Sequence, residues 1–222
     1  MLAQQISLEI EIPFEKLRLK GELIVPAQPL GVVLFAHGSG SSRFSPRNQF
    51  VAERLRNHRL GTMLFDLLTE EEEEQDRSTG HLRFDIDLLA RRLLGATRWY
   101  YQKEPLMAIG YFGSSTGGGA ALVPEARSEV AVRAIVSRGG RSDLAGPALP
   151  KVKAPTLLIV GENDPAVVEL NREAYARMQC PRELKIVPRA THLFEEPGTL
   201  QQVSDMAAEW FELHFKAVNT LN

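Results

Sequence analysis

The sequence predicts an α/β fold in which a mostly parallel sheet lies between two layers of helices. Two segments at the start of the chain alternate apolar and polar residues, as half-exposed strands do. After them, short and continuously apolar runs alternate with longer segments of helical spacing. Strands in such runs are covered on both faces, and their alternation with helices requires right-handed crossovers between parallel strands. An antiparallel hairpin should therefore precede a parallel sheet.

The elements follow in order along the chain. The entry hairpin is expected at residues 6–12 and 16–25. Ser45 should cap the first helix, with Pro46 as its first residue, and Gly61 should end it. Buried strands are predicted at 32–36, 62–66, 106–112, 132–136, 156–160 and 184–187, further helices at 82–101, from 116 onwards, at 165–178 and at 199–217, and loops at 70–74 and 139–153.

Length and composition indicate an ordinary globular protein. A chain of 222 residues favours a single domain over 1–222, and a net charge of −2 favours neither nucleic-acid binding nor disorder. With Cys180 as the one cysteine, an internal disulfide framework and a cysteine-based zinc site are excluded. The chain shows no signal-peptide pattern and no apolar run long enough to span a membrane. We therefore expect a soluble cytoplasmic protein that needs no metal or cofactor and acts on a small molecule.

The stretch LMAIGYFGSSTGGGAA at 106–121 predicts a strand, a tight turn and a helix. Of the two serines at the turn, Ser115 alone has glycine both two residues before and two residues after it. A nucleophile on such a strained turn is crowded on both sides, so its neighbours must lack side chains. The backbone N–H of Thr116 and the start of the next helix should then face a developing oxyanion. Ser115 is the predicted nucleophile.

The same glycines allow a second interpretation. Gly113, Gly117 and Gly119 have a spacing that can hold a dinucleotide pyrophosphate at the start of a helix. That site normally follows the first strand of its unit, with an acidic residue at the end of the next strand. Here half of the chain comes first, and the next apolar run ends in Ser137 and Arg138. The dinucleotide interpretation is therefore the less favoured one.

A serine nucleophile needs a base and an orienting acid, and both should follow other strands. Asp164 follows the strand at 156–160, and His192 follows the last strand at 184–187. The chain order Ser, Asp, His is the one expected for a serine on a strand-to-helix turn of this kind. Asp164 precedes Pro165 and could instead cap a helix. The other candidates for the acid are Glu162, Asp143 and Asp66.

The second oxyanion donor should come from the loop after the strand at 32–36, and we predict the Ser39 backbone N–H beside that of Thr116. Four side chains are candidates to line the acyl or anionic end of a substrate. They are Phe194, Arg43, Arg138 and Arg141. The loop between the strands at 132–136 and 156–160 is too short to hold a cap domain, which favours small esters with short acyl groups.

These motifs resemble the α/β-hydrolase superfamily, and within it the dienelactone hydrolase-like branch. The similar segments are LFAHGSGSS at 34–42, GYFGSSTGGGAAL at 110–122, LLIVGENDP at 157–165 and ATHLFEEPG at 190–198. The resemblance implies a three-layer α/β-hydrolase sandwich and a triad of Ser115, Asp164 and His192. It also implies an oxyanion hole from Thr116 and from the residue after Gly38. Dienelactone hydrolases carry cysteine as the nucleophile, so serine at position 115 favours a serine esterase on the same scaffold.

The expected function is hydrolysis of small carboxylic esters through an acyl-enzyme intermediate. A thioesterase, a lactonase or an acyltransferase would use the same triad, and a non-catalytic binding module of this fold is a further alternative. The sequence does not indicate the acyl length, the enantioselectivity or the oligomeric state.

Overall fold

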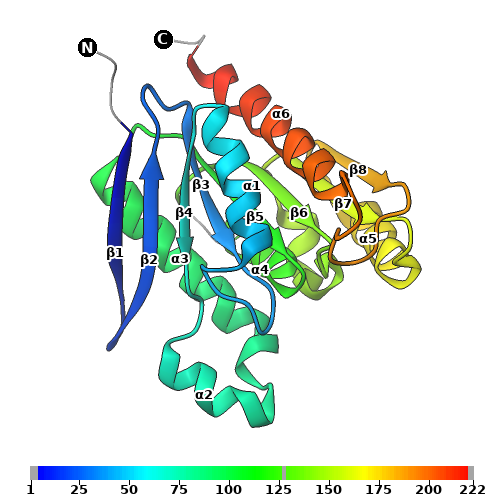
Figure 1. The fold of residues 1–222 in the computed structure, drawn as a ribbon, viewed down its shortest axis with the longest axis horizontal. Coiled ribbons are helices and arrows are strands. Elements are labelled where there is room, and N and C mark those ends of the chain that lie inside the picture. Colours follow the sequence, from blue (N-terminus) through cyan, green and yellow to red (C-terminus); the bar gives the residue numbers. More distant parts are fainter. Residues whose placement is uncertain (1–4, 127–128, 220–222) are drawn as a thin grey trace.

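The computed structural model describes residues 5–126 and 129–219, and its centre is an eight-stranded sheet (Figure 1). The spatial order of the strands is β1-β2-β4-β3-β5-β6-β7-β8. The strands are β1 (Ile6–Phe14), β2 (Leu17–Val25), β3 (Gly31–Ala36), β4 (Leu60–Phe65), β5 (Ile109–Ser114), β6 (Val132–Arg138), β7 (Thr156–Gly161) and β8 (Arg182–Val187).

The pairing of the strands confirms the predicted fold class. β1 pairs antiparallel with β2, and β2 pairs antiparallel with β4. From β4 through β3, β5, β6 and β7 to β8, all neighbours are parallel. The carboxyl ends of these parallel strands therefore meet at one edge of the sheet, where open α/β sheets place their sites. β3 lies beside β5, as the position predicted for the oxyanion loop requires.

Helices cover both faces of the sheet, which gives three layers (Figure 1). One face packs against α1 (Pro46–Asn57) and α6 (Thr199–Asn219), with Val51, Leu55 and Phe211 in its apolar layer. The other face packs against α3 (Ile86–Lys103), α4 (Thr116–Glu125) and α5 (Pro165–Arg177). Within the described residues, no helix combines the length and hydropathy that crossing a membrane requires.

Several local predictions are wrong. Leu106, predicted in the buried nucleophile strand, is fully exposed in a turn, and β5 begins only at Ile109. The first helix ends before Gly61, which lies in β4. Asp85 caps α3 through the Leu88 N–H and so separates it from a short 3-10 turn, η1 (Leu82–Phe84). The predicted loop at 139–153 is largely a kinked 3-10 segment, η2 (Ser142–Lys151).

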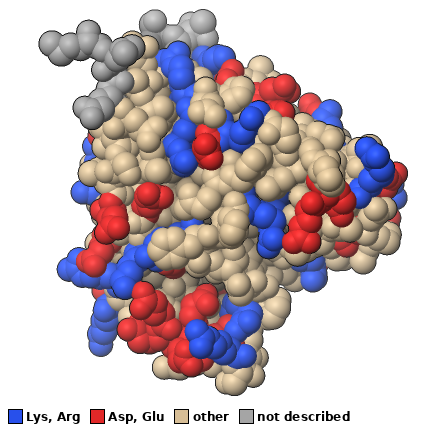
Figure 2. All heavy atoms as spheres, in the orientation of Figure 1, with Lys and Arg blue, Asp and Glu red and all other residues tan. Residues whose placement is uncertain are grey.

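The acidic run at 70–74 is also not a loop but the start of α2 (Glu70–Thr79). A reciprocal capping box joins Thr69 and Glu72 and starts this helix. Buried Arg92 of α3 holds Glu72 through two 2.6 Å bonds, and buried Asp76 receives a 2.7 Å bond from Arg83. Figure 2 shows acidic side chains gathered over this part of the surface. These contacts fix α2 and η1 in the connection between β4 and α3. The described residues contain no separate cap domain.

Candidate active site

Ser115 lies in the tight turn between β5 and α4, as predicted. Its φ of 51° and ψ of −123° are unusual for a residue with a side chain, and such a backbone persists only where its surroundings fix it. Here the Ser115 carbonyl accepts bonds from the N–H groups of Gly118 and Arg141, each at 2.9 Å. The Ser115 N–H donates to the Arg138 carbonyl at 3.3 Å. The turn at Ser115 is therefore held by α4 on one side and by the segment from Arg138 to Arg141 on the other.

The flanking glycines are required by close backbone approach. A Cβ at Gly113 would collide with the carbonyl of Gly117, and a Cβ at Gly117 would collide with the carbonyl of Ala36. A Cβ at Gly119 would meet the Arg141 carbonyl. Packing of α4 against β3 and η2 thus accounts for the glycine spacing that also suggested a dinucleotide site. The structure therefore favours a turn that carries a nucleophile over a dinucleotide-binding site.

His192 and Asp164 meet Ser115 at the carboxyl edge of the sheet. The His192 Nε2 lies 3.4 Å from the Ser115 Oγ, and its Nδ1 lies 2.7 Å from the Asp164 Oδ2. The loops after β5, β7 and β8 supply the three side chains. The 3.4 Å separation is longer than a good hydrogen bond, as is common before a substrate binds. The arrangement suits transfer of a proton from a hydroxyl to an imidazole that a carboxylate orients.

The partners of each carboxylate distinguish between the candidates for the acid. Asp164 occupies the N-cap position of α5, but its side chain makes no capping bond and faces His192 instead. Glu162 accepts from the Arg189 N–H at 2.8 Å. Asp143 pairs with Arg141, and Asp66 pairs with Arg43. Of the four, Asp164 is the one bonded to the imidazole.

The loop after β3 lies against the nucleophile. A Cβ on Gly38 would be 2.9 Å from the Ser115 Cβ and 3.7 Å from its Oγ, so the backbone leading to Ser39 passes beside the reactive hydroxyl. Thr116 is the first residue of α4, where amide groups have no acceptor within the helix. The two predicted oxyanion donors therefore lie in segments that adjoin the Ser115 side chain.

Sequence reasoning missed the role of His37 in this loop. Its Nε2 accepts from the Leu67 N–H at 2.9 Å, so its Nδ1 carries the proton and donates to the Gly38 carbonyl at 3.0 Å. Burial lowers the pKa of His37, which keeps the ring neutral at pH 7. His37 thus connects the loop after β3 to the segment that follows β4. The sequence signal was its position between a buried strand and a glycine.

Comparisons with known proteins identify the family to which this fold belongs. A dienelactone hydrolase from Anabaena variabilis is 54% identical, covers 95% of this chain and 99% of its own, and superposes with a TM-score of 0.92. The chain belongs to the dienelactone hydrolase-like α/β-hydrolases. The esterase Est1E from Butyrivibrio proteoclasticus (15% identity, TM-score 0.76, 94% and 99% coverage) and a lidless serine hydrolase from Xanthomonas campestris (17%, 0.75, 93% and 94%) share the fold. No protein-family model matches the sequence.

Two curated relatives carry a different name. Proteins from two strains of Mycobacterium tuberculosis, each a provisionally named phosphoribosyl transferase, are 52% identical over 208 residues. The match covers 93% of this chain but 46% of each relative. The chain therefore spans about half the length of the curated relatives that it matches.

The four side chains predicted to line a substrate site have different environments. Phe194 is 1% exposed within the apolar layer that includes α6, so in this conformation it offers no surface to a substrate. The charge of Arg43 is compensated by Asp66, and that of Arg141 by two bonds of 2.9 and 2.8 Å to Asp143. Arg138, at the end of β6, is 6% exposed and has no carboxylate partner in the described part of the chain.

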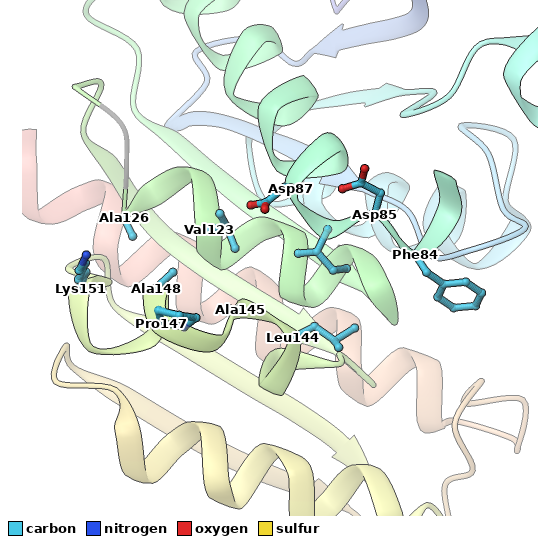
Figure 3. Close-up of a pocket in the computed structure, with 11 residues that line it drawn as sticks. Phe84, Asp85, Asp87, Val123, Ala126, Leu144, Ala145, Pro147, Ala148 and Lys151 are labelled. Atoms are coloured by element: carbon cyan, nitrogen blue, oxygen red, sulfur yellow. The ribbon is translucent and has the colours of Figure 1, made fainter. Parts of the chain in front are cut away.

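A hollow of about 460 Å³ has none of Ser115, Asp164 and His192 in its lining (Figure 3). It opens between η2, the end of α4 and the start of α3, with a floor that includes Val123 and Ala148. Asp85, Asp87 and Lys151 line it as well. Within residues 5–126 and 129–219, no three His, Cys, Asp or Glu side chains form a group that could hold a metal ion.

Proposed function

We propose that this protein is a serine carboxylic-ester hydrolase that acts on small esters with short acyl groups. The observation that carries the proposal is the continuous chain from the Ser115 Oγ through His192 to Asp164, with contacts of 3.4 and 2.7 Å. A serine hydroxyl is a weak nucleophile unless a neighbouring base accepts its proton. The membership of a hydrolase family and the pairing of the other carboxylates support the same assignment.

The reaction proceeds in two steps. His192 takes the hydroxyl proton while the Ser115 Oγ attacks the ester carbonyl, and Asp164 holds the imidazole with its Nε2 free to accept that proton. The backbone N–H groups of Ser39 and Thr116 bind the oxyanion of the tetrahedral intermediate. It collapses when His192 protonates the leaving alcohol, which leaves an acyl-Ser115 ester. Water activated by the same histidine then releases the acid.

The preference for small substrates is inferred from the lack of a cap over the carboxyl edge of the sheet among the described residues. The segment between β6 and β7 is η2, and the described residues contain no cap that would enclose a long acyl chain. Thioesters and lactones present the same carbonyl to the same groups, so comparing kcat/KM for an ester, a thioester and a lactone of equal acyl length would rank these substrates. An acyltransferase would differ in accepting an alcohol or amine in place of water.

The name of the mycobacterial relatives does not alter this proposal. It applies to proteins about twice as long as the matched segment. The matched segment is 52% identical to this chain, so we assign the hydrolase fold to that half. Phosphoribosyl transfer in those relatives would then depend on the half that this chain does not match.

The decisive experiment combines covalent labelling with a single substitution. An organophosphate or sulfonyl fluoride should add to Ser115, as peptide mass spectrometry would show, and Ser115→Ala should abolish turnover of p-nitrophenyl acetate. Ser114→Ala is the matched control, because Ser114 is the last residue of β5 and immediately precedes Ser115. Equal rates for Ser115→Ala and the unmodified protein would end the proposal.

A further inference from the structure

Among the described residues, two arginines are almost fully buried, and their surroundings differ sharply. Arg92 is 2% exposed, but Glu72 and the Leu67 carbonyl bind its guanidinium through contacts of 2.6 Å. Arg138 is 6% exposed, and its Nε and Nη1 have no hydrogen-bond partner among the described residues. A buried charge without a counter-ion is costly, so proteins seldom retain one without a use for it.

The surroundings of Arg138 are electropositive. Its Nη2 makes one long contact of 3.5 Å, to the neutral side-chain carbonyl of Asn48. Burial, and next the positive charge of Arg47, lower the pKa of Arg138 to about 10, so it is still protonated at neutral pH. Arg47 and Asn48 belong to the first turn of the twelve-residue helix α1, and that turn contains no acidic residue. Glu195 compensates the charge of Arg47 through a 3.2 Å ion pair, so the positive end of the helix dipole adds to the charge of Arg138 alone.

Arg138 lies next to the nucleophile. It pairs with Ser114 across β5 and β6, and its carbonyl accepts the Ser115 N–H. Neighbouring strands are about 4.8 Å apart, so the backbones of the two residues are almost in contact. Arg43 and Arg141 already have carboxylate partners, so Arg138 is the candidate arginine with unused hydrogen-bond donors.

We propose that Arg138, together with the first turn of α1, forms an anion-binding subsite for a carboxylate or phosphate group carried by the substrate of Ser115. The proposal rests on the ester hydrolase function. An anion would supply the oxygen acceptors that the Nε and Nη1 of this guanidinium lack. Because Arg138 adjoins Ser115, the anionic group must lie only a few bonds from the scissile carbonyl. The favoured substrate is thus a short ester whose acyl part ends in an anion.

The kinetic test compares two esters of the same acyl length. Mono-p-nitrophenyl succinate carries a terminal carboxylate, and p-nitrophenyl butyrate is neutral. The ratio of their kcat/KM values should fall about 10–100-fold in Arg138→Gln, the usual effect of losing a hydrogen bond to a charged group. Arg133→Gln is the matched control, because Arg133 lies on the same strand with an exposed side chain. An unchanged ratio in Arg138→Gln would overturn the proposal.

A binding test does not depend on turnover. Calorimetry on Ser115→Ala protein should detect succinate or inorganic phosphate, and the second substitution Arg138→Met should remove that binding. Binding of succinate alone would identify a carboxylate as the ligand group, and binding of phosphate alone would identify a phosphate. Binding of neither anion would refute the subsite. If Ser115→Ala protein still hydrolysed esters, the proposed function would fail while this binding result still stood.

Thermal stability distinguishes the subsite from a purely structural arginine. Removing an uncompensated buried charge should raise the Tm of Arg138→Met by about 2–4 °C, and succinate or phosphate should raise the Tm of the unmodified protein alone. A structural arginine would give the opposite result, because its loss would lower the Tm and the anions would act equally on both proteins.

Discussion

Replacing Asp164 by asparagine tests which carboxylate orients the catalytic base. The Asp164 Oδ2 accepts from the His192 Nδ1 at 2.7 Å, which leaves the Nε2 without a proton and 3.4 Å from the Ser115 Oγ. An asparagine amide can donate to Nδ1, and the ring proton then resides on Nε2, where it blocks acceptance of the serine proton. We expect kcat/KM for p-nitrophenyl acetate to fall about 10³–10⁴-fold, or about 4–5.5 kcal/mol of transition-state stabilisation.

Glu162→Gln provides the matched control for this prediction. Glu162 follows the same strand, but it accepts from the Arg189 N–H at 2.8 Å, and a glutamine carbonyl can accept the same bond. Its kcat/KM should stay within about twofold of the original value. The folding of Asp164→Asn should be nearly normal, because a single partly exposed hydrogen bond contributes only about 1 kcal/mol. The reasoning is refuted if Asp164→Asn keeps more than a tenth of the activity, or if Glu162→Gln loses as much.

Three further predictions concern stability. Ser115→Gly should unfold in urea with a free energy about 1 kcal/mol higher than Ser115→Ala, because glycine adopts the positive φ without strain; equal values would contradict this. Thr116→Val should raise the free energy of unfolding by about 1 kcal/mol, because the buried Thr116 hydroxyl has no partner in the described residues, and a decrease would show that it has one. Burial alone would raise the pKa of Asp76, but bonds from Arg83 and from two backbone N–H groups lower it from 3.8 to about 2. Its stabilising contribution is complete above the ordinary pKa and is lost as the pH falls towards 2, so the stability gap between the unmodified protein and Asp76→Asn should narrow between about pH 5 and pH 2. A gap that does not vary over that range would contradict the role of Asp76.

The predictions that succeeded rested on patterns that read the same in any tertiary context. Continuous apolar runs correctly located the parallel strands. The flanking glycines and the chain order selected Ser115, Asp164 and His192, whose side chains lie together in the structure and whose catalytic roles stay predictions. These features are local, or follow from the rule that parallel strands end at the same edge.

The predictions that failed depended on distant residues. The acidic run at 70–74 reads as a solvated loop until Arg92, twenty residues from Glu72, binds one of its carboxylates. Leu106 extends an apolar run, but the chain is still in a turn there. The same holds for Arg138, since only the packed structure reveals that Arg43 and Arg141 have partners and that Arg138 lacks one.

The outermost position of β8 has a consequence for how activity is lost. This strand pairs with β7 alone among the described strands, and the loop that follows it carries His192. Edge elements open locally at a lower free energy than the sheet interior. At low denaturant concentration, the proposed esterase activity should therefore be lost because β8 and the loop with His192 separate from the sheet. The central strands should still protect their amide hydrogens from exchange. Loss of activity would thus measure local opening of β8 rather than global unfolding of the protein.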